Sequence, residues 1–215
     1  VPALALSGFS LLAHATPVAA LYQTHCAACH GEQRQGAMAP ALLPQSLERV
    51  RPAEALAVIQ QGRPATQMAG FSGTLSAEDI ASLAAFIRTE PTTPPRWTAA
   101  DITASRIEHV KPHSLPDTPR FRADPQNLFL VVEAGTHHVT VLDGDTLTPI
   151  HRFKSRFALH GGPKYSRDGR YVFFASRDGW VSKFDLWNLT TVAEIRVGLN
   201  TRNLAVSDDG QWVMV

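Results

Sequence analysis

Both cysteines of the sequence lie in one five-residue stretch, CAACH, at residues 26–30. The spacing C-x-x-C-H is the attachment signal of a c-type heme. On a helix, Cys26 and Cys29 share one face, so both thiols can reach the vinyl groups of one porphyrin. His30 would then lie under the iron, with a neutral ring nitrogen as ligand and the other ring nitrogen oriented by a hydrogen bond. The motif predicts heme c on Cys26 and Cys29, with iron ligation by His30.

The same residues fit two other kinds of site less well. A thioredoxin-like redox pair needs a βαβ context, which the Ala-rich surroundings do not offer. Half of a zinc site needs further cysteines or a histidine pair nearby. Heme attachment is therefore the leading interpretation.

A sixth iron ligand has three candidates, Met38, Met68 and Met214. Met38 is close to the attachment helix and reads as a loop residue beside the heme, and Met214 falls in a β-rich region. Met68 lies between two expected helices and can cross the distal face of the heme. His/Met ligation raises the reduction potential and suits electron transfer. It leaves no open coordination position, so we expect Met68 to complete a one-electron relay that does not bind substrate by itself.

Three helices are expected around this site, at residues 22–29, 52–61 and 76–88. Ser76 is a good N-cap, and Asp79 completes a start that resembles a capping box. Apolar residues at helical spacing make one face of the last helix: Ile80, Leu83, Ala84 and Ile87. On the sequence CAACHG, the Met68 loop and this closing helix, residues 21–90 resemble the all-α class I cytochromes c.

The N-terminal segment VPALALSGFSLLAHATPVAA is apolar and uncharged, with a small-residue site ending at Ala15. It reads as the remainder of a secretory signal peptide, residues 1–15, which implies a periplasmic protein. A buried helix or a membrane anchor is the alternative, but the run is short for a bilayer span. We therefore expect no membrane span in the mature protein. A net charge of +1 gives no field that would favour nucleic acid.

After the cytochrome segment, residues 16–90, the composition changes twice. Six prolines between residues 91 and 120 should break any regular element, which predicts a linker or a strap on another surface. From residue 121 onward, β-branched runs alternate with Asp-Gly turns. VTVLDGDTLTPI at 139–150 matches VSKFDLWNLTTV at 181–192, and SRDG at 166–169 recurs as SDDG at 207–210.

A repeat of about 40–45 residues with several short strands is typical of a propeller blade. The alternative is two chance hairpins, but two markers keep nearly the same spacing. A propeller needs about four to eight blades to close. We therefore expect residues 121–215 to hold the first blades of an all-β propeller in a longer protein.

The β-rich half resembles the heme d1 propeller of the cytochrome cd1 nitrite reductase family, which has a cytochrome domain upstream. The resemblance rests on GRYVFFASRDGWVSKFDLW at 169–187 and TTVAEIRVG at 190–198. HGGPKYSRDGRYVFFASRDGW at 160–180 and the short cytochrome loop at 38–56 are similar to the NirN-like members of that family. The resemblance implies an eight-bladed propeller and, as bound group, heme d1 or dihydro-heme d1.

Three residues correspond to positions that bind heme d1 in the family. His160 falls near its axial histidine, although the spacing differs by about one residue. Arg177 in SRDGW and Arg202 in NTRNL match arginines that bind d1 carboxylates, a role that suits bidentate guanidinium groups. Each assignment has a structural alternative. His160 could be a turn residue, and the two arginines could pair with aspartates in the turns of the propeller. The reductase has a further arginine on the first strand of its d1 domain, and FLVVEAGTHHVTVLDGD contains no arginine that could match it. This difference speaks against the reductase.

Other histidines and tryptophans are expected to be structural. His137 and His138 should point to opposite faces of a strand. Pro112 argues against a helix that would place His109 and His113 on one metal. Trp180 and Trp187 are expected to pack within blades.

The resemblance implies oxidation of dihydro-heme d1 to heme d1 in heme d1 biosynthesis, with electrons leaving through the c heme. The alternatives are nitrite reduction to nitric oxide and a non-enzymatic heme d1 carrier. Expected partners are the heme d1 precursor, a periplasmic electron acceptor, heme d1 maturation proteins and nitrite reductase. The catalytic base is unassigned and is expected beyond residue 215.

Overall fold

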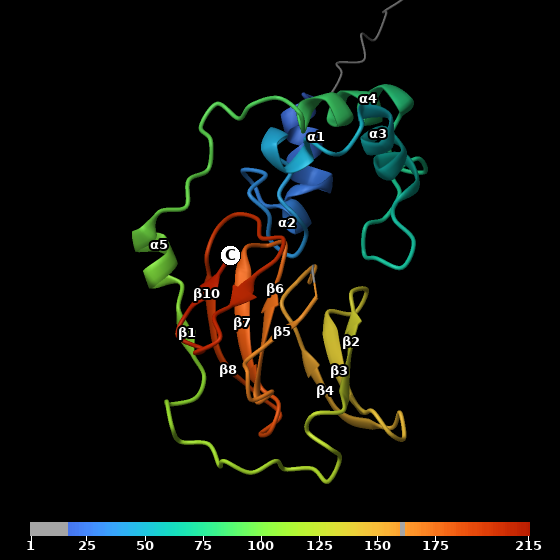
Figure 1. The fold of residues 1–215 in the computed structure, drawn as a ribbon. Coiled ribbons are helices and arrows are strands. Elements are labelled where there is room, and N and C mark those ends of the chain that lie inside the picture. Colours follow the sequence, from blue (N-terminus) through green and yellow to red (C-terminus); the bar gives the residue numbers. More distant parts are fainter. Residues whose placement is uncertain (1–16, 160–161) are drawn as a thin grey trace, which may run out of the picture.

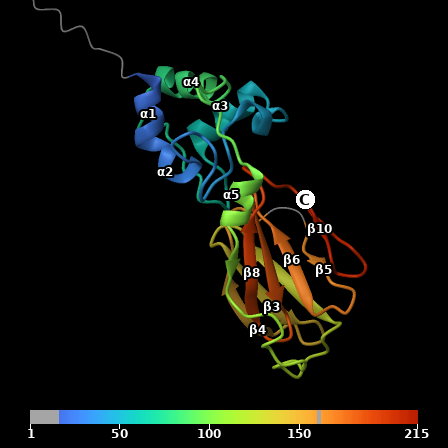
Figure 2. The same ribbon diagram turned by 90° about the vertical axis from the view of Figure 1, so that its left-hand side faces the viewer.

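The computed structural model describes residues 17–159 and 162–215 and places a group of helices at one end of a set of antiparallel strands (Figure 1). A long segment leaves the helices, follows one side of the strands and enters the first large strand from the far end (Figures 1 and 2). The expected signal-peptide segment, residues 1–15, lies outside the described residues. None of the helices in the described ranges is long and apolar enough to cross a membrane.

The helical part packs around one apolar core. Its elements are α1 (Val18–His25), α2 (Ala27–His30), the short 3-10 helix η1 (Pro44–Leu47), α3 (Pro52–Gln61) and α4 (Ala77–Phe86). The four apolar residues expected to form one face of α4 are all buried. Ser76 caps this helix, and its Oγ accepts a hydrogen bond from the Asp79 backbone N–H at 3.1 Å. The helices expected at residues 52–61 and 76–88 are confirmed, the second with its ends shorter by one and two residues.

The helix expected at residues 22–29 is wrong in its bounds. The chain is helical from Val18, breaks at Cys26 and resumes in α2. Cys26 has φ −121° and ψ −35°, so it stands at the junction and not inside a helix. Cys26 therefore lies between the two helices, while Cys29 and His30 belong to the short second helix.

Residues 91–120 form a strap on the strands and contain regular structure that the prolines were expected to exclude. Helix α5 (Ala99–Ala104) forms because Thr98 and Asp101 make a reciprocal capping box, which satisfies the first free N–H groups. Strand β1 (Ile107–Glu108) then pairs with β8 (Thr190–Arg196). The Trp97 indole also donates to the Arg196 carbonyl at 2.9 Å. The strap alternative therefore describes this segment better than a free linker.

The strands form three antiparallel groups. The first blade is β2 (Leu128–Glu133), β3 (His138–Asp143) and β4 (Pro149–Lys154). The second blade is β5 (Lys164–Tyr165), β6 (Tyr171–Ala175), β7 (Trp180–Asp185) and β8, with β1 added at its outer edge. The third hairpin is β9 (Ala205–Val206) and β10 (Val213–Met214). Within the described residues these blades do not close into a ring.

The register of the strands confirms the sequence repeat. The β3–β4 ladder has a bulge between Val141 and Leu142, and the β7–β8 ladder has one at the matching positions 183 and 184. In the turns that follow β3 and β7, Leu147 and Leu189 both have positive φ, +57° and +53°. The hairpins β5–β6 and β9–β10 also pair at a constant offset of 41 residues. Independent features that repeat at nearly the same spacing, 42 residues for the bulges and 41 for the hairpins, exclude two chance hairpins.

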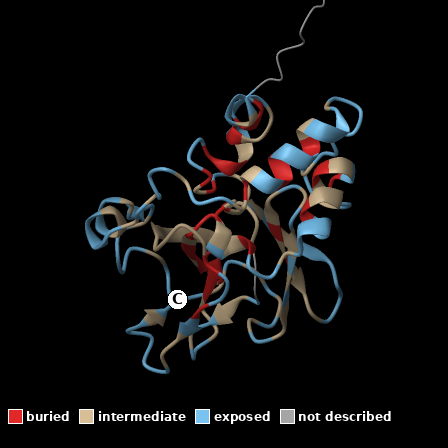
Figure 3. Cartoon of the chain, turned by 90° about the horizontal axis from the view of Figure 1, so that it is seen from above, coloured by how far each residue is buried: buried red, intermediate tan, exposed pale blue. Residues whose placement is uncertain are grey.

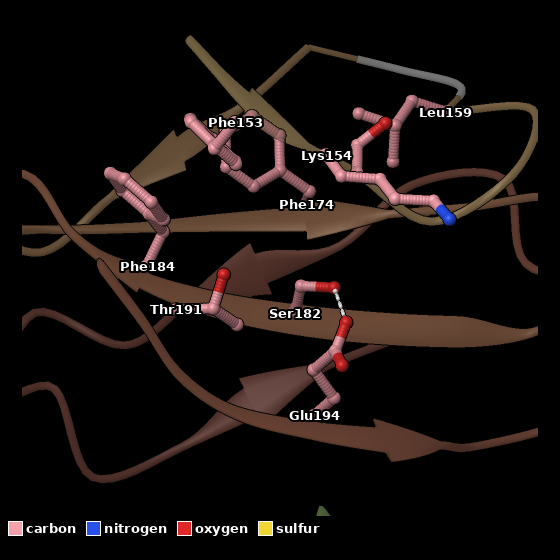
Figure 4. Close-up of a pocket in the computed structure, with 9 residues that line it drawn as sticks. Phe153, Lys154, Leu159, Phe174, Ser182, Phe184, Thr191 and Glu194 are labelled. Atoms are coloured by element: carbon pink, nitrogen blue, oxygen red, sulfur yellow. Dashed lines mark hydrogen bonds between the residues drawn. The ribbon is translucent and has the colours of Figure 1, made fainter. Parts of the chain in front are cut away.

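Buried residues concentrate among the helices and along the central strands (Figure 3). The first and second blades meet through aromatic side chains, and the Phe153 and Phe184 rings stack at 3.9 Å (Figure 4). Glu194 joins the blades at the edge of this seam. It accepts two hydrogen bonds from Arg156 of the segment after β4, at 2.7 and 2.8 Å, and one from Ser182 of β7 at 2.8 Å.

Candidate functional site

The CAACH residues lie where the helices meet the loop that follows them. His30 is buried, and its Nδ1–H donates a hydrogen bond to the Pro40 carbonyl oxygen at 2.8 Å. This hydrogen bond fixes the ring and leaves Nε2 as the lone-pair nitrogen. Burial lowers the pKa of His30, so its imidazole is neutral at pH 7. A neutral, oriented imidazole is what an iron ligand requires.

The two thiols are unpaired and half-buried beside this histidine. Burial, and then the neighbouring Cys29, raise the pKa of the Cys26 thiol to about 11. No disulfide joins them, so both sulfurs are free for thioether bonds. The donor set of two thiols and one imidazole therefore fits covalent heme c.

Backbone contacts hold the loop after the motif against the helices. The Gly36 N–H donates to the His30 carbonyl at 2.8 Å, and the Ala39 N–H to the Cys29 carbonyl at 2.9 Å. Arg34 is buried, and its guanidinium donates to the Phe86 carbonyl of α4 at 2.7 Å. Sequence reasoning missed both Arg34 and the Pro40 acceptor. A loop arginine that folds into a core gives no local pattern.

The three methionines occupy different environments. Met38 lies in the same loop as Pro40, whose carbonyl oxygen accepts the hydrogen bond from His30. Met68 is half-buried in the loop between α3 and α4, and Met214 is 69% exposed in β10. Met68 thus remains the candidate from a different segment of the helical part, the loop between α3 and α4.

A second group of candidate residues gathers at the strand ends that face the helices. The Arg177 N–H donates to the Ala158 carbonyl at 3.0 Å, and the Thr201 hydroxyl donates to the Ser176 carbonyl at 2.5 Å. These bonds bring together three segments that are far apart in sequence: the one after β4, the β6–β7 turn and the one after β8. His160 itself lies outside the described residues.

Arg177 is the most unusual side chain of this group. It is half-buried, and its Nε atom is buried with no hydrogen-bond partner among the described residues. Burial first, and then the positive charges of Arg202 and Arg63, lower the pKa of its guanidinium. Arg177 and Arg202 therefore lie close together, and the cation Arg63 of the cytochrome part lies near them. Clustered guanidiniums with a buried unsatisfied donor form a site for an anion such as a carboxylate.

The remaining expected residues have structural contacts. His138 begins β3, but His137 has φ +56° and lies in the preceding turn, so the expected alternation on one strand is wrong. The His137 ring packs edge-on against Phe157. His109 pairs with Glu194 at 3.0 Å, and His113 itself has a positive φ.

The two tryptophans pack beneath arginines. The Arg156 guanidinium lies 3.7 Å from the Trp180 ring centre, and the Arg170 guanidinium 5.3 Å from that of Trp187. These contacts agree with the expected role in blade packing. They also occupy the two arginines, whereas the Nε atom of Arg177 has no hydrogen-bond partner among the described residues.

A groove of about 630 Å³ follows the outer seam between the first and second blades. His109, His151, Arg156 and Glu194 line it together with the aromatic seam of Figure 4. Its carboxylate, Glu194, is already bound by Arg156, His109 and Ser182. The carboxylate of the groove is therefore satisfied, in contrast to the Arg177 guanidinium at the other strand end.

Two families match successive parts of the chain. Residues 13–87 match the family described as cytochrome C oxidase, cbb3-type, subunit III, and residues 123–215 match the cytochrome D1 heme domain. The chain is 60% identical, over 93% of its length, to a dihydro-heme d1 dehydrogenase of Pseudomonas aeruginosa, of which it covers 40%. It is 28% identical over 87% of its length to a nitrite reductase of Stutzerimonas stutzeri, of which it covers 36%.

A solved structure agrees with these matches. The structure of dihydro-heme d1 dehydrogenase NirN in complex with DHE has a TM-score of 0.80 and 60% identity, over 92% of this chain and 42% of that one. The chain thus spans about two fifths of the length of the relatives it matches. A cytochrome segment followed by a D1-domain segment, with 60% identity along nearly the whole chain, makes the chain similar to the NirN-like members of the cytochrome cd1 nitrite reductase family.

Proposed function

We propose that the protein oxidises dihydro-heme d1 to heme d1, with electrons leaving through a c heme in its helical part. The observation that carries the proposal is the Arg177 guanidinium. It is half-buried beside Arg202, has an unsatisfied buried Nε, and lies at the strand end that faces the helices. A substrate rich in carboxylates could bind these guanidinium groups at the strand end. The name and similarity of the Pseudomonas aeruginosa dehydrogenase support this substrate.

In the helical part, Cys26 and Cys29 would hold heme c, and His30 and Met68 would bind its iron. Bound there, heme c accepts and passes on one electron at a time. The chain's own contribution is orientation, because the Pro40 carbonyl keeps His30 in one tautomer and the buried surroundings keep its imidazole neutral. Arg34 fixes the intervening loop to α4.

In the strand part, Arg177 and Arg202 would bind carboxylates of the macrocycle, and His160 is proposed as its axial ligand from resemblance alone. Paired guanidinium–carboxylate bonds set the angle of a planar ligand as well as its affinity. The ring would thus be held at the end of the strands that faces the c heme. The proposed domains are residues 16–90 and 121–215, joined by the strap at 91–120.

The reaction converts a propionate side chain to an acrylate, and the substrate loses two electrons and two protons. The electrons leave singly for an external acceptor. The proton acceptor is not assigned to a residue of this chain. We further propose export to the periplasm, where the acceptor, heme d1 maturation proteins and nitrite reductase would be the partners. Similarity to the nitrite reductase and to the proteins NirF and NirC supports a heme d1 context.

The test mixes the protein carrying its c heme with dihydro-heme d1 without oxygen. Reduction of the c heme, followed by absorbance, should accompany the loss of two hydrogens from the macrocycle, followed by mass spectrometry. Replacement of His30 by Ala should abolish c-heme reduction, while Arg167→Gln, remote from the strand end, should not change it.

Two outcomes would replace the proposal. Rapid release of nitric oxide from nitrite and a reduced donor would make the protein a nitrite reductase, with electrons flowing in the opposite direction. Tight binding of dihydro-heme d1 without any conversion would make it a carrier.

A further inference from the structure

The loop that carries Met68 is closed by its own hydrogen bonds. The Arg63 N–H donates to the Met68 carbonyl at 2.9 Å, and the Thr66 hydroxyl donates to the Arg63 carbonyl at 2.9 Å. The Thr66 hydroxyl also accepts from the Met68 N–H at 3.1 Å. Gly62, with φ +76°, has no room for a side chain, since a Cβ would lie 2.5 Å from the Met68 carbonyl oxygen. Residues 62–68 therefore move as one unit, and a shift at one point displaces Met68.

This loop touches the first blade at the turn between β2 and β3. The Gln67 side chain donates to the Gly135 carbonyl at 3.2 Å. A Cβ on Gly135 would lie 3.2 Å from the Ala65 carbonyl oxygen, so the two backbones approach closely. Figure 1 shows the loop after α3 reaching toward the end of β2. Two residues of the loop, Ala65 and Gln67, thus contact one glycine of the other part of the molecule.

The turn that receives the loop is itself firmly built. Glu133, at the end of β2, accepts hydrogen bonds from Arg152, from Thr136 within the turn and from Thr140 of β3, at 2.7, 3.0 and 2.6 Å. The Arg152 hydrogen bond is the main reason that the pKa of Glu133 falls to about 2. The turn is therefore a fixed surface, and the loop must adjust to it.

We propose that Gly135 is a positioning residue for the methionine ligand of the c heme, through its contact with residues 65 and 67. This inference rests on the proposed ligation by Met68. The first blade would then set the strength of the iron–sulfur bond, and with it the reduction potential of the relay. A Cβ at this position would already be tight against the Ala65 carbonyl oxygen, so a branched side chain such as valine should displace the Met68 loop from the turn.

The experiment uses the protein with its c heme attached and the variants Gly135→Val and Gln67→Ala. Both should weaken the red absorption band that a methionine sulfur gives to ferric heme, and both should lower the reduction potential. Added imidazole should displace the methionine about three- to tenfold more readily, the equivalent of one lost hydrogen bond. The two changes together should be less than additive, because they disturb one contact.

Gly73→Val is the matched control, since a Cβ on Gly73 meets nothing within 4 Å. It should leave the band, the potential and the imidazole affinity unchanged. A wild-type spectrum without the methionine band would overturn the ligation, and the inference with it. A normal band that Gly135→Val and Gln67→Ala leave unchanged would overturn the inference alone.

Discussion

The tetrapeptide Ser-Arg-Asp-Gly occurs at residues 166–169 and again at 176–179, and it forms the same turn at opposite ends of strand β6. In both turns the serine hydroxyl donates to the aspartate two residues later, and the glycine N–H donates to the serine carbonyl at 2.9 Å. Both glycines have positive φ, +71° and +91°. Arg167 is 77% exposed and pairs with Asp208 at 2.9 Å, whereas Arg177 is half-buried with an unsatisfied Nε.

The aspartates of the two turns differ in the same way. Hydrogen bonds from Ser166 and the Arg170 backbone outweigh burial and lower the pKa of Asp168. Burial dominates at Asp178 and raises its pKa. The tetrapeptide therefore determines the shape of the turn, while the place of the turn in the fold determines the chemistry of its side chains.

The largest difference should appear in binding of the macrocycle. Arg177→Gln removes a charge-assisted bond of about 1.5–3 kcal/mol, so the affinity for dihydro-heme d1 should fall roughly ten- to hundredfold. Arg167→Gln makes the same change in an identical tetrapeptide and should leave the affinity unchanged. Titration followed by absorbance measures both. Equal effects of the two variants would place the carboxylate site elsewhere.

A smaller difference is expected in stability when a methyl group is added to each glycine. At Gly169 a Cβ would meet the end of the flexible Gln126 side chain, so Gly169→Ala should cost about 1–2 kcal/mol for its backbone conformation. At Gly179 the Cβ would collide with the Gly198 backbone carbonyl, so Gly179→Ala should cost roughly 2–5 kcal/mol. Urea unfolding compares the two. Similar midpoints for both variants would show that the segment after β8 yields to the added methyl.

The aspartates predict opposite pH dependence of stability. The folded-state pKa of Asp178 is raised, so its contribution is greatest at low pH and falls as the pH rises above the ordinary value of 3.8. The folded-state pKa of Asp168 is lowered, so its contribution is present above 3.8 and is lost on acidification.

Relative to the wild type, Asp178→Asn should therefore gain stability as the pH rises above about 4, and Asp168→Asn should lose stability as the pH rises toward about 4 from below. Unfolding midpoints measured on both sides of pH 4 for the three proteins test the sign. The same slope for both variants would contradict the difference between the two turns.

The sequence predicted those features that depend on neighbours along the chain. The CAACH motif, the cap at Ser76 and the spacing of the blades are local patterns, and the structure contains each of them. The Pro40 acceptor, the buried Arg34 and the unsatisfied Arg177 depend on segments that meet only after folding. The break at Cys26 was missed because the motif spacing placed both cysteines on one helix. The helix at residues 99–104 was missed because the number of prolines around it outweighed the capping signal of Thr98 and Asp101.

The smallest effect on stability is expected for the exposed ion pair of Arg167 and Asp208. Arg167 and Asp208 are both more than three-quarters exposed, and they join the second blade to the third hairpin. A double-mutant cycle with Arg167→Gln and Asp208→Asn should give a coupling of about 0.2–1 kcal/mol, because water screens such a pair. Raising the salt concentration should reduce it further. A larger coupling that resists salt would mean that the fold also holds Arg167 in place. The difference between Arg167 and Arg177 would then come from the partner of each guanidinium and not from its exposure to water.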